Sequence, residues 1–182
     1  MKAIVYTKYG SPAVLALKEI EKPVIKDNEI LIMVKATTVN RTDCAMLRAK
    51  PFIMRLLTGL FKPKNPVLGT DFAGTIETVG KDVLSFKAGD KVFGFDDKGL
   101  SSHAQYLALP ADKNISAIPE NITYQQAAAS SEGAHYAYNM IKKAKLTFRI
   151  FRTLPTPGEF FSFFGYLQTL TERRMFISSH SP

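Results

Sequence analysis

The residues best suited to chemistry lie together in the stretch VNRTDCAMLR, residues 39–48. It contains the only cysteine of the chain, Cys44, directly after an aspartate and three residues after Arg41. A thiolate beside a cation can act as a nucleophile or as a metal ligand. The amide of Asn40, the hydroxyl of Thr42 and the guanidinium of Arg41 can instead hold a polar or anionic group without any thiol. The stretch therefore allows three alternatives, namely a metal site, an activated thiol, or a site that uses neither.

The metal alternative fails on the number of available ligands. Zn²⁺ is held by about four nitrogen, sulfur or carboxylate ligands that converge on one point. One cysteine and three scattered histidines do not supply such a set at any evident spacing. The sequence therefore predicts no metal site, and a single cysteine also excludes an intramolecular disulfide.

The thiol alternative is weaker than a structural role for Cys44. The residue lies in the short apolar turn CAML, and free cysteines in such positions usually behave as small buried hydrophobic residues. Arg41 could favour a thiolate there, so an activated thiol stays open as the alternative. Neither His103 nor His135 is close to Cys44 in the sequence. We expect Cys44 to be buried and not to act as a nucleophile.

Length and composition are typical of a globular domain, or of one domain with an appendage. The chain has 182 residues, of which 46% are hydrophobic, so it can bury a core. No segment approaches the roughly 18 apolar residues of a membrane span, and the start MKAIVYTKYGSP lacks a signal-peptide core. We therefore expect a cytoplasmic protein without a membrane partner.

The charge of the chain is positive but is not concentrated in a block. The net charge is +8, from 24 Lys and Arg against 16 Asp and Glu. The cations are spread along the chain and accompany no DNA- or RNA-binding motif. The sequence therefore predicts no nucleic-acid partner, and attraction for anionic cofactors or substrates is a simpler use of the charge.

The elements that must position VNRTDCAMLR are mostly strands. Residues that favour strands are enriched in AIVYT, VLALKEI, EILIMVKATTV, FAGTIETV, KVFGF and HAQYLALP, which turn residues separate. A helical candidate, TDCAMLRA, precedes an irregular basic segment from Lys50 to Pro66. Six or more short strands with glycine turns favour a mainly β fold, either a small barrel or a sandwich.

The pattern changes after Pro119. Residues 124–145 contain no proline and one glycine, which favours a helix, and Thr123 could cap it. Apolar residues recur there at helical spacing: Ala127, Ala134, Tyr138 and Ile141. From residue 147 the composition changes again, with the breaker TLPTPG and seven of the 13 phenylalanines in the last 36 residues. We therefore divide the chain into a domain over residues 1–146 and an atypical aromatic-rich tail over residues 147–182.

The first of these units resembles a known family. The motifs MKAIVYTKYGSP, EILIMVKATTVNRTD, PVLGTDFAGTIETVGKDVLSFKAGDKVFGF, AQYLALP and PENITYQQAAASSEGAHYAYNMI are similar to the N-terminal GroES-like domain of the medium-chain dehydrogenase/reductase superfamily. The resemblance is to its zinc-independent quinone oxidoreductase and alcohol dehydrogenase-like branch. It implies a partly open β-barrel with a few helices, followed in the family by a Rossmann domain that binds NAD(P).

The resemblance also implies a chemistry without metal. Asn40 and Thr70 occupy positions where zinc-dependent relatives carry ligands, and residues 127–131 offer no cysteine. The implied reaction is hydride transfer from NADPH to a quinone or an α,β-unsaturated carbonyl, with the protein stabilising charge on the substrate oxygen. By resemblance Asn40 and Thr42 are the catalytic donors, Arg41 contacts the cofactor pyrophosphate, and Glu132 lies near the nicotinamide.

Two neighbouring carboxylates receive supporting roles. Asp43 is expected to orient its neighbours or to act as the N-cap of the following turn. By resemblance Asp71 braces the barrel.

The chain departs from the family pattern after Leu146. A glycine-rich phosphate turn should follow there, but the only later glycines are Gly158 and Gly165. We expect the Rossmann domain to be missing, NADPH to bind weakly or not at all, and the chain to be inactive alone. A truncated, frame-shifted or foreign C-terminus and a natural short variant both stay open. The alternative function is a non-catalytic GroES-like protein-interaction module, and the aromatic tail is a candidate for homo-oligomer contacts.

Overall fold

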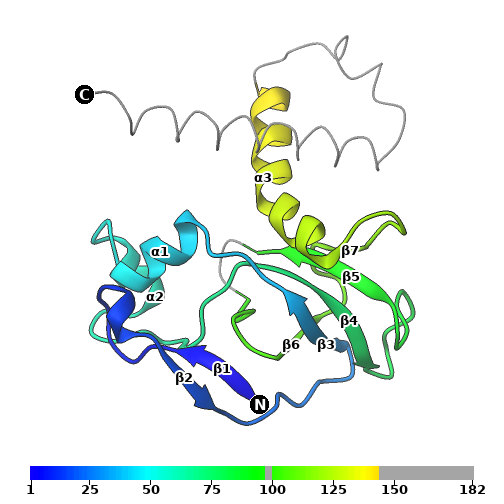
Figure 1. Ribbon diagram of the computed structural model, residues 1–182, viewed down its shortest axis with the longest axis horizontal. Coiled ribbons are helices and arrows are strands. Elements are labelled where there is room, and N and C mark those ends of the chain that lie inside the picture. Colours follow the sequence, from blue (N-terminus) through cyan, green and yellow to red (C-terminus); the bar gives the residue numbers. More distant parts are fainter. Residues whose placement is uncertain (97–99, 144–182) are drawn as a thin grey trace, which may run out of the picture.

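The computed structural model describes residues 1–96 and 100–143. The predicted tail over residues 147–182 lies outside the described residues, and so do the predictions that depend on it. Within the described part, the only elements are short helices, one long helix and two antiparallel sheets (Figure 1).

The larger sheet has five antiparallel strands in the order β6-β3-β4-β5-β7. Its strands are β3 (Glu29–Ala36), β4 (Asp71–Val79), β5 (Lys91–Phe95), β6 (Tyr106–Pro110) and β7 (Ile115–Ala117). The smaller sheet pairs β1 (Lys2–Val5) with β2 (Ala16–Glu19). Isolated bridges at Ala3↔Ala104 and Val5↔Val67 link β1 to the segments that precede β6 and β4. The mainly β prediction is confirmed, and the described strands do not close into a complete barrel.

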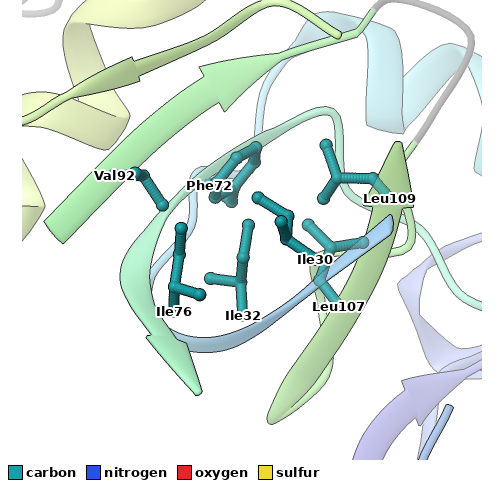
Figure 2. Close-up of a cluster of buried hydrophobic side chains, with 7 residues drawn as sticks. All are labelled: Ile30, Ile32, Phe72, Ile76, Val92, Leu107 and Leu109. Atoms are coloured by element: carbon teal, nitrogen blue, oxygen red, sulfur yellow. The ribbon is translucent and has the colours of Figure 1, made fainter. Parts of the chain in front are cut away.

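The core of the large sheet lies on one face of its central strands. Seven buried side chains point towards one another there (Figure 2): Ile30, Ile32, Phe72, Ile76, Val92, Leu107 and Leu109. Residues two apart on a strand share a face, which is why Ile30 and Ile32 enter the same core. Each such side chain contributes about 1.5–3 kcal/mol when fully removed from water. This core fixes the sheet from which the candidate site extends.

Strand β3 is irregular just before it reaches that site. Its register with β4 shifts between Leu31 and Ile32 and again between Val34 and Ala36. Such bulges bend a strand and re-aim the residues that follow. The second shift lies directly before the segment that leads into the helix carrying residues 41–48.

Helix α1 (Arg41–Arg48) begins with a capping box. The Asn40 side chain accepts a hydrogen bond from the Asp43 backbone N–H, and the Asp43 carboxylate accepts one from the Asn40 backbone N–H. Of the two roles expected for Asp43, the N-cap is therefore wrong, whereas its carboxylate does orient its neighbour Asn40. Asn40 occupies the cap because its extended backbone places its amide oxygen over the N–H groups of the first turn.

Two other short elements differ from the sequence expectation. The first residue of the segment VLALKEI, Val14, ends a 3₁₀ turn, η1 (Pro12–Val14), in which the proline fixes a helical φ, and the strand β2 begins only at Ala16. The basic segment from Lys50 to Pro66, expected to be irregular, contains the helix α2 (Met54–Thr58).

Helix α3 (Tyr124–Lys143) packs against β3, β4 and β5 at its start and then extends away from the sheet (Figure 1). Thr123 and Gln126 form the predicted cap, with the Gln126 N–H donating to Thr123 Oγ1 at 3.2 Å. Ala127 is fully buried, whereas Tyr138 on the same predicted face is 51% exposed. The face is therefore buried only near the sheet.

Candidate active site

A polar cluster lies where the segment before α1 meets the start of β4 and the middle of α3. Its centre is the buried carboxylate of Asp71, the first residue of β4. Its Oδ2 accepts hydrogen bonds from Thr38 Oγ1 at 2.6 Å and Asn40 Nδ2 at 2.9 Å. Its Oδ1 accepts from the Ser131 hydroxyl and from the Glu132 backbone N–H at 3.2 Å. One carboxylate therefore ties β4, α1 and α3 together, as its expected bracing role requires.

The predicted donor Asn40 is already engaged within this cluster. Its Nδ2 donates to Thr70 Oγ1 at 2.6 Å as well as to Asp71, and its Oδ1 accepts from the Asp43 N–H at 3.0 Å. Both amide hydrogens and the amide oxygen thus have partners inside the protein. Donation to a substrate oxygen would require Asn40 to give up Thr70 or Asp71, so that role stays a prediction.

The structure brings together Thr42 and Glu132, which are 90 residues apart in the sequence. Thr42 Oγ1 donates to Glu132 Oε1 at 3.0 Å and joins the first turn of α1 to α3. Burial raises the pKa of the Glu132 carboxyl above its ordinary value, and the nearby charges of Asp71 and Asp43 raise it further. The Thr42 hydrogen bond opposes this shift. The pair can therefore hold a proton beside a hydroxyl donor.

Arg41 is the exposed cation of the site. It is the first residue of α1, and its side chain faces solvent. Within residues 1–96 and 100–143 no ion pair of Arg41 is present. The guanidinium is thus available to an anionic group at the positive end of a short helix.

A second buried carboxylate, Asp43, lies next to the cluster. Its Oδ1 accepts from the Gly69 N–H at 3.0 Å, and its Oδ2 lies 3.8 Å from Nε2 of His103. Burial raises the pKa of Asp43, against the hydrogen bond from the Asn40 N–H, the His103 charge and the bond from Gly69. His103 Nε2 also lies 2.8 Å from the Thr38 carbonyl oxygen. The pairing of Asp43 with His103 was missed in the sequence, where only the isolated types are visible.

Cys44 lies outside this cluster. It is half-buried rather than buried, so the expectation of full burial is wrong. Its side chain lines an apolar cavity of about 710 Å³ between the small sheet, β3 and α1. Ile4, Leu17 and Val34 are among the other lining residues, whereas Asn40, Thr42 and Glu132 are not. Cys44 therefore faces an apolar cavity that Asp43 and His103 also line.

The described residues contain no group of three or more His, Cys, Asp and Glu that could hold a metal ion. Thr70, where a zinc ligand stands in some relatives by resemblance, is fully buried and accepts from Asn40. In the part of the chain that the structure describes, no helix has the length and hydropathy of a membrane span.

The chain was compared with known families and proteins. The model of the alcohol dehydrogenase GroES-like domain matches residues 26–120. Quinone oxidoreductase of Sus scrofa is 38% identical over 130 residues, which are 71% of this chain and 37% of that protein. The 2-methylene-furan-3-one reductase of Solanum lycopersicum is 35% identical over 156 residues, covering 79% of this chain and 37% of that protein. The chain thus spans well under half the length of these relatives.

Solved structures of similar proteins agree with the sequence matches. A quinone oxidoreductase from Coxiella burnetii superposes with a TM-score of 0.70 at 29% identity, over 80% of this chain and 45% of that chain. An Escherichia coli quinone oxidoreductase complexed with NADPH gives a TM-score of 0.63 at 27% identity, over 79% and 41% respectively.

Proposed function

The chain belongs to the alcohol dehydrogenase GroES-like domain family, in the quinone oxidoreductase-like branch of the medium-chain dehydrogenase/reductase superfamily, and we propose that it forms the substrate side of an NADPH-dependent reductase. The proposed substrates are quinones or α,β-unsaturated carbonyls, as the names of similar proteins suggest. The observation that carries the proposal is the Thr42–Glu132 pair beside the Asp71 cluster.

The chemistry proposed for this chain is stabilisation of a developing oxyanion. NADPH, when bound, supplies the hydride, and negative charge then grows on the carbonyl oxygen of the substrate. The Thr42 hydroxyl can turn from Glu132 and donate to that oxygen, because a hydroxyl hydrogen rotates freely. A protonated Glu132 can in turn donate to Thr42 Oγ1, which is 3.0 Å away. Its raised pKa supports this role because it favours the protonated form.

The described residues fit only a small part of a dinucleotide. Arg41 offers one charge-assisted contact, worth roughly 1.5–3 kcal/mol. We therefore propose that these residues alone bind NADPH weakly and that the chain is inactive without further cofactor contacts.

The alternative, a non-catalytic interaction module of the GroES-like type, is favoured by one observation. The side chains of Asn40, Thr42 and Asp71 all form hydrogen bonds with one another or with neighbouring protein groups. Such a closed network can serve stability alone. The two functions differ in whether the cluster binds a carbonyl compound.

Binding of 2-cyclohexen-1-one and 1,4-naphthoquinone, followed by ¹⁵N NMR, tests the proposal. The chain should carry Cys44→Ser so that these probes cannot add to the thiol. Amide shifts should concentrate at the start of α1 and at Glu132, and Thr42→Val should weaken binding severalfold. Thr78→Val, at an exposed threonine of β4, is the matched control. Shifts that are absent at millimolar probe, or that Thr42→Val leaves unchanged, would favour the interaction module.

A further inference from the structure

An exposed apolar patch covers helix α2 and the residues on either side of it. We call it the α2 patch, and its large side chains are between 45% and 87% exposed: Phe52, Ile53, Leu56, Leu57, Leu60 and Phe61. Single exposed apolar residues are normal on proteins, but contiguous patches usually mark an interaction surface. Six such residues within ten positions need a partner that accepts apolar surface.

The α2 patch belongs to an anchored element rather than to a loose loop. The hydroxyl of Tyr9 lies 2.8 Å from Thr58 Oγ1 and donates to the Gly59 carbonyl at 2.6 Å. Met54 packs inward against the cluster that contains Met46 and Leu47. Because these contacts hold one side of the segment against the domain, its remaining apolar side chains stay directed towards solvent.

The segment that carries the α2 patch has charges of one sign. Residues 44–70 contain five cations and no acidic residue: Arg48, Lys50, Arg55, Lys62 and Lys64. The acids that border this segment, Asp43 and Asp71, are both buried. In the described part of the chain none of the five cations forms an ion pair. The segment that carries the α2 patch therefore combines exposed apolar side chains with cations alone.

We propose that the α2 patch docks on an anionic lipid surface. Large apolar side chains that enter the headgroup boundary and cations that meet anionic headgroups are the two components of peripheral membrane binding. A second copy of this chain fits less well, because a symmetric contact would bring the same five cations against one another. The expectation of no membrane partner rested on the lack of a spanning segment, and peripheral docking needs none.

This inference is independent of the proposed reductase function, since no residue of the α2 patch belongs to the polar cluster. It predicts that the full chain sediments with vesicles of phosphatidylcholine and phosphatidylglycerol at 70:30. Binding to phosphatidylcholine alone should be at least tenfold weaker, and binding to the mixed vesicles should fall steeply with salt.

Two pairs of variants separate the apolar contribution from the charge. Leu57→Ser with Phe61→Ser keeps the net charge and should lower the partition coefficient at least tenfold. Its matched control is Leu84→Ser, since Leu84 is 96% exposed and does not belong to the α2 patch. Lys62→Gln with Lys64→Gln should lower partitioning about fivefold for each cation removed. Its control, Lys18→Gln with Lys87→Gln, makes the same change in net charge.

All four substituted sets lie at exposed positions. Thermal unfolding followed by circular dichroism checks that each variant is folded. The proposal is overturned if the chain does not bind the anionic vesicles at low salt. It is equally overturned if the serine pair and Leu84→Ser reduce binding alike. A concentration-dependent dimer that the serine pair abolishes, without any vesicle binding, would assign the patch to a second copy instead.

Discussion

Replacing Asp71 by asparagine tests whether one carboxylate holds α1 and α3 on the sheet. Asp71 accepts four hydrogen bonds, from the Thr38 and Ser131 hydroxyls, the Asn40 amide and the Glu132 N–H. Asparagine keeps the shape of the side chain but replaces one acceptor oxygen by an NH₂ group. That group would face donors wherever it points.

The expected cost follows from the partners that each donor retains. Asn40 can still donate to Thr70, and the Ser131 hydroxyl can still donate to the Ala128 carbonyl, which is 3.1 Å away. The Thr38 hydroxyl and the Glu132 N–H then compete for the one remaining amide oxygen. A hydrogen bond to a charged group is worth about 1.5–3 kcal/mol. Loss of the Asp71 charge also relieves its repulsion of Glu132. We expect Asp71→Asn to lower the free energy of unfolding by about 2–3 kcal/mol.

Urea unfolding followed by far-UV circular dichroism at pH 7 measures this loss, because the chain has no tryptophan to report by fluorescence. A double-mutant cycle of Asp71→Asn with Ser131→Ala should give a coupling energy of about 1–2 kcal/mol, since the two side chains bond directly. The matched control, Asp112→Asn at an exposed position, should stay within about 0.5 kcal/mol. A loss below about 1 kcal/mol with zero coupling would refute the anchoring role of Asp71.

Three further predictions follow from the site. Gly69→Ala should cost more than about 2 kcal/mol in thermal or urea unfolding, because a Cβ there would lie 2.2 Å from Ser102 Oγ and the φ of +111° is strained for other residues; an unchanged midpoint would contradict this. The raised pKa of Asp43 means that its folded state binds the proton more tightly, so its contribution to stability is present below pH 3.8 and is lost as pH rises through the folded pKa. Asp43→Asn should flatten that fall in urea midpoints between pH 3.5 and 7, and parallel curves for both proteins would disprove it. NADPH should bind with a dissociation constant on the order of a millimolar by calorimetry, because Arg41 supplies one contact; micromolar affinity would reveal a missed phosphate site.

The strands could be predicted from the sequence because the side-chain alternation that defines a strand involves only neighbouring residues. The alternation that places Ile30 and Ile32 in one core can be seen in neighbouring residues of the sequence. The cap at Thr123 was equally visible, because its partner Gln126 lies three residues on. At α1 the sequence left Asp43 as a candidate for the N-cap, whereas Asn40 occupies it. Both types favour the N-cap, and only the backbone conformation before α1 decides between them.

The polar cluster could be predicted only in part. The resemblance pointed to Asn40, Thr42 and Glu132, and in the structure Asn40 and Glu132 bond to Asp71 while Thr42 bonds to Glu132. The contact between Asp43 and His103 joins positions 60 residues apart. No periodicity in the sequence encodes such a pairing, because it depends on how the segments that carry the two residues meet in the fold. The α2 patch was missed for another reason, since exposure is a property of the fold and the segment reads only as basic and irregular.

Some residues of the proposed site also hold the fold together, whereas others do not, and this difference decides how the function can be tested. Asn40 caps α1 and bonds to both Thr70 and Asp71, so any change there alters the helix start and the cluster together. Thr42 makes a single side-chain bond in the described structure, to Glu132, from a half-buried position in the first turn of α1. Its removal by Thr42→Val therefore leaves the Asn40 cap and the Asp71 bonds in place. Because a change at Thr42 separates ligand binding from folding, it is the residue on which the reductase interpretation can be decided.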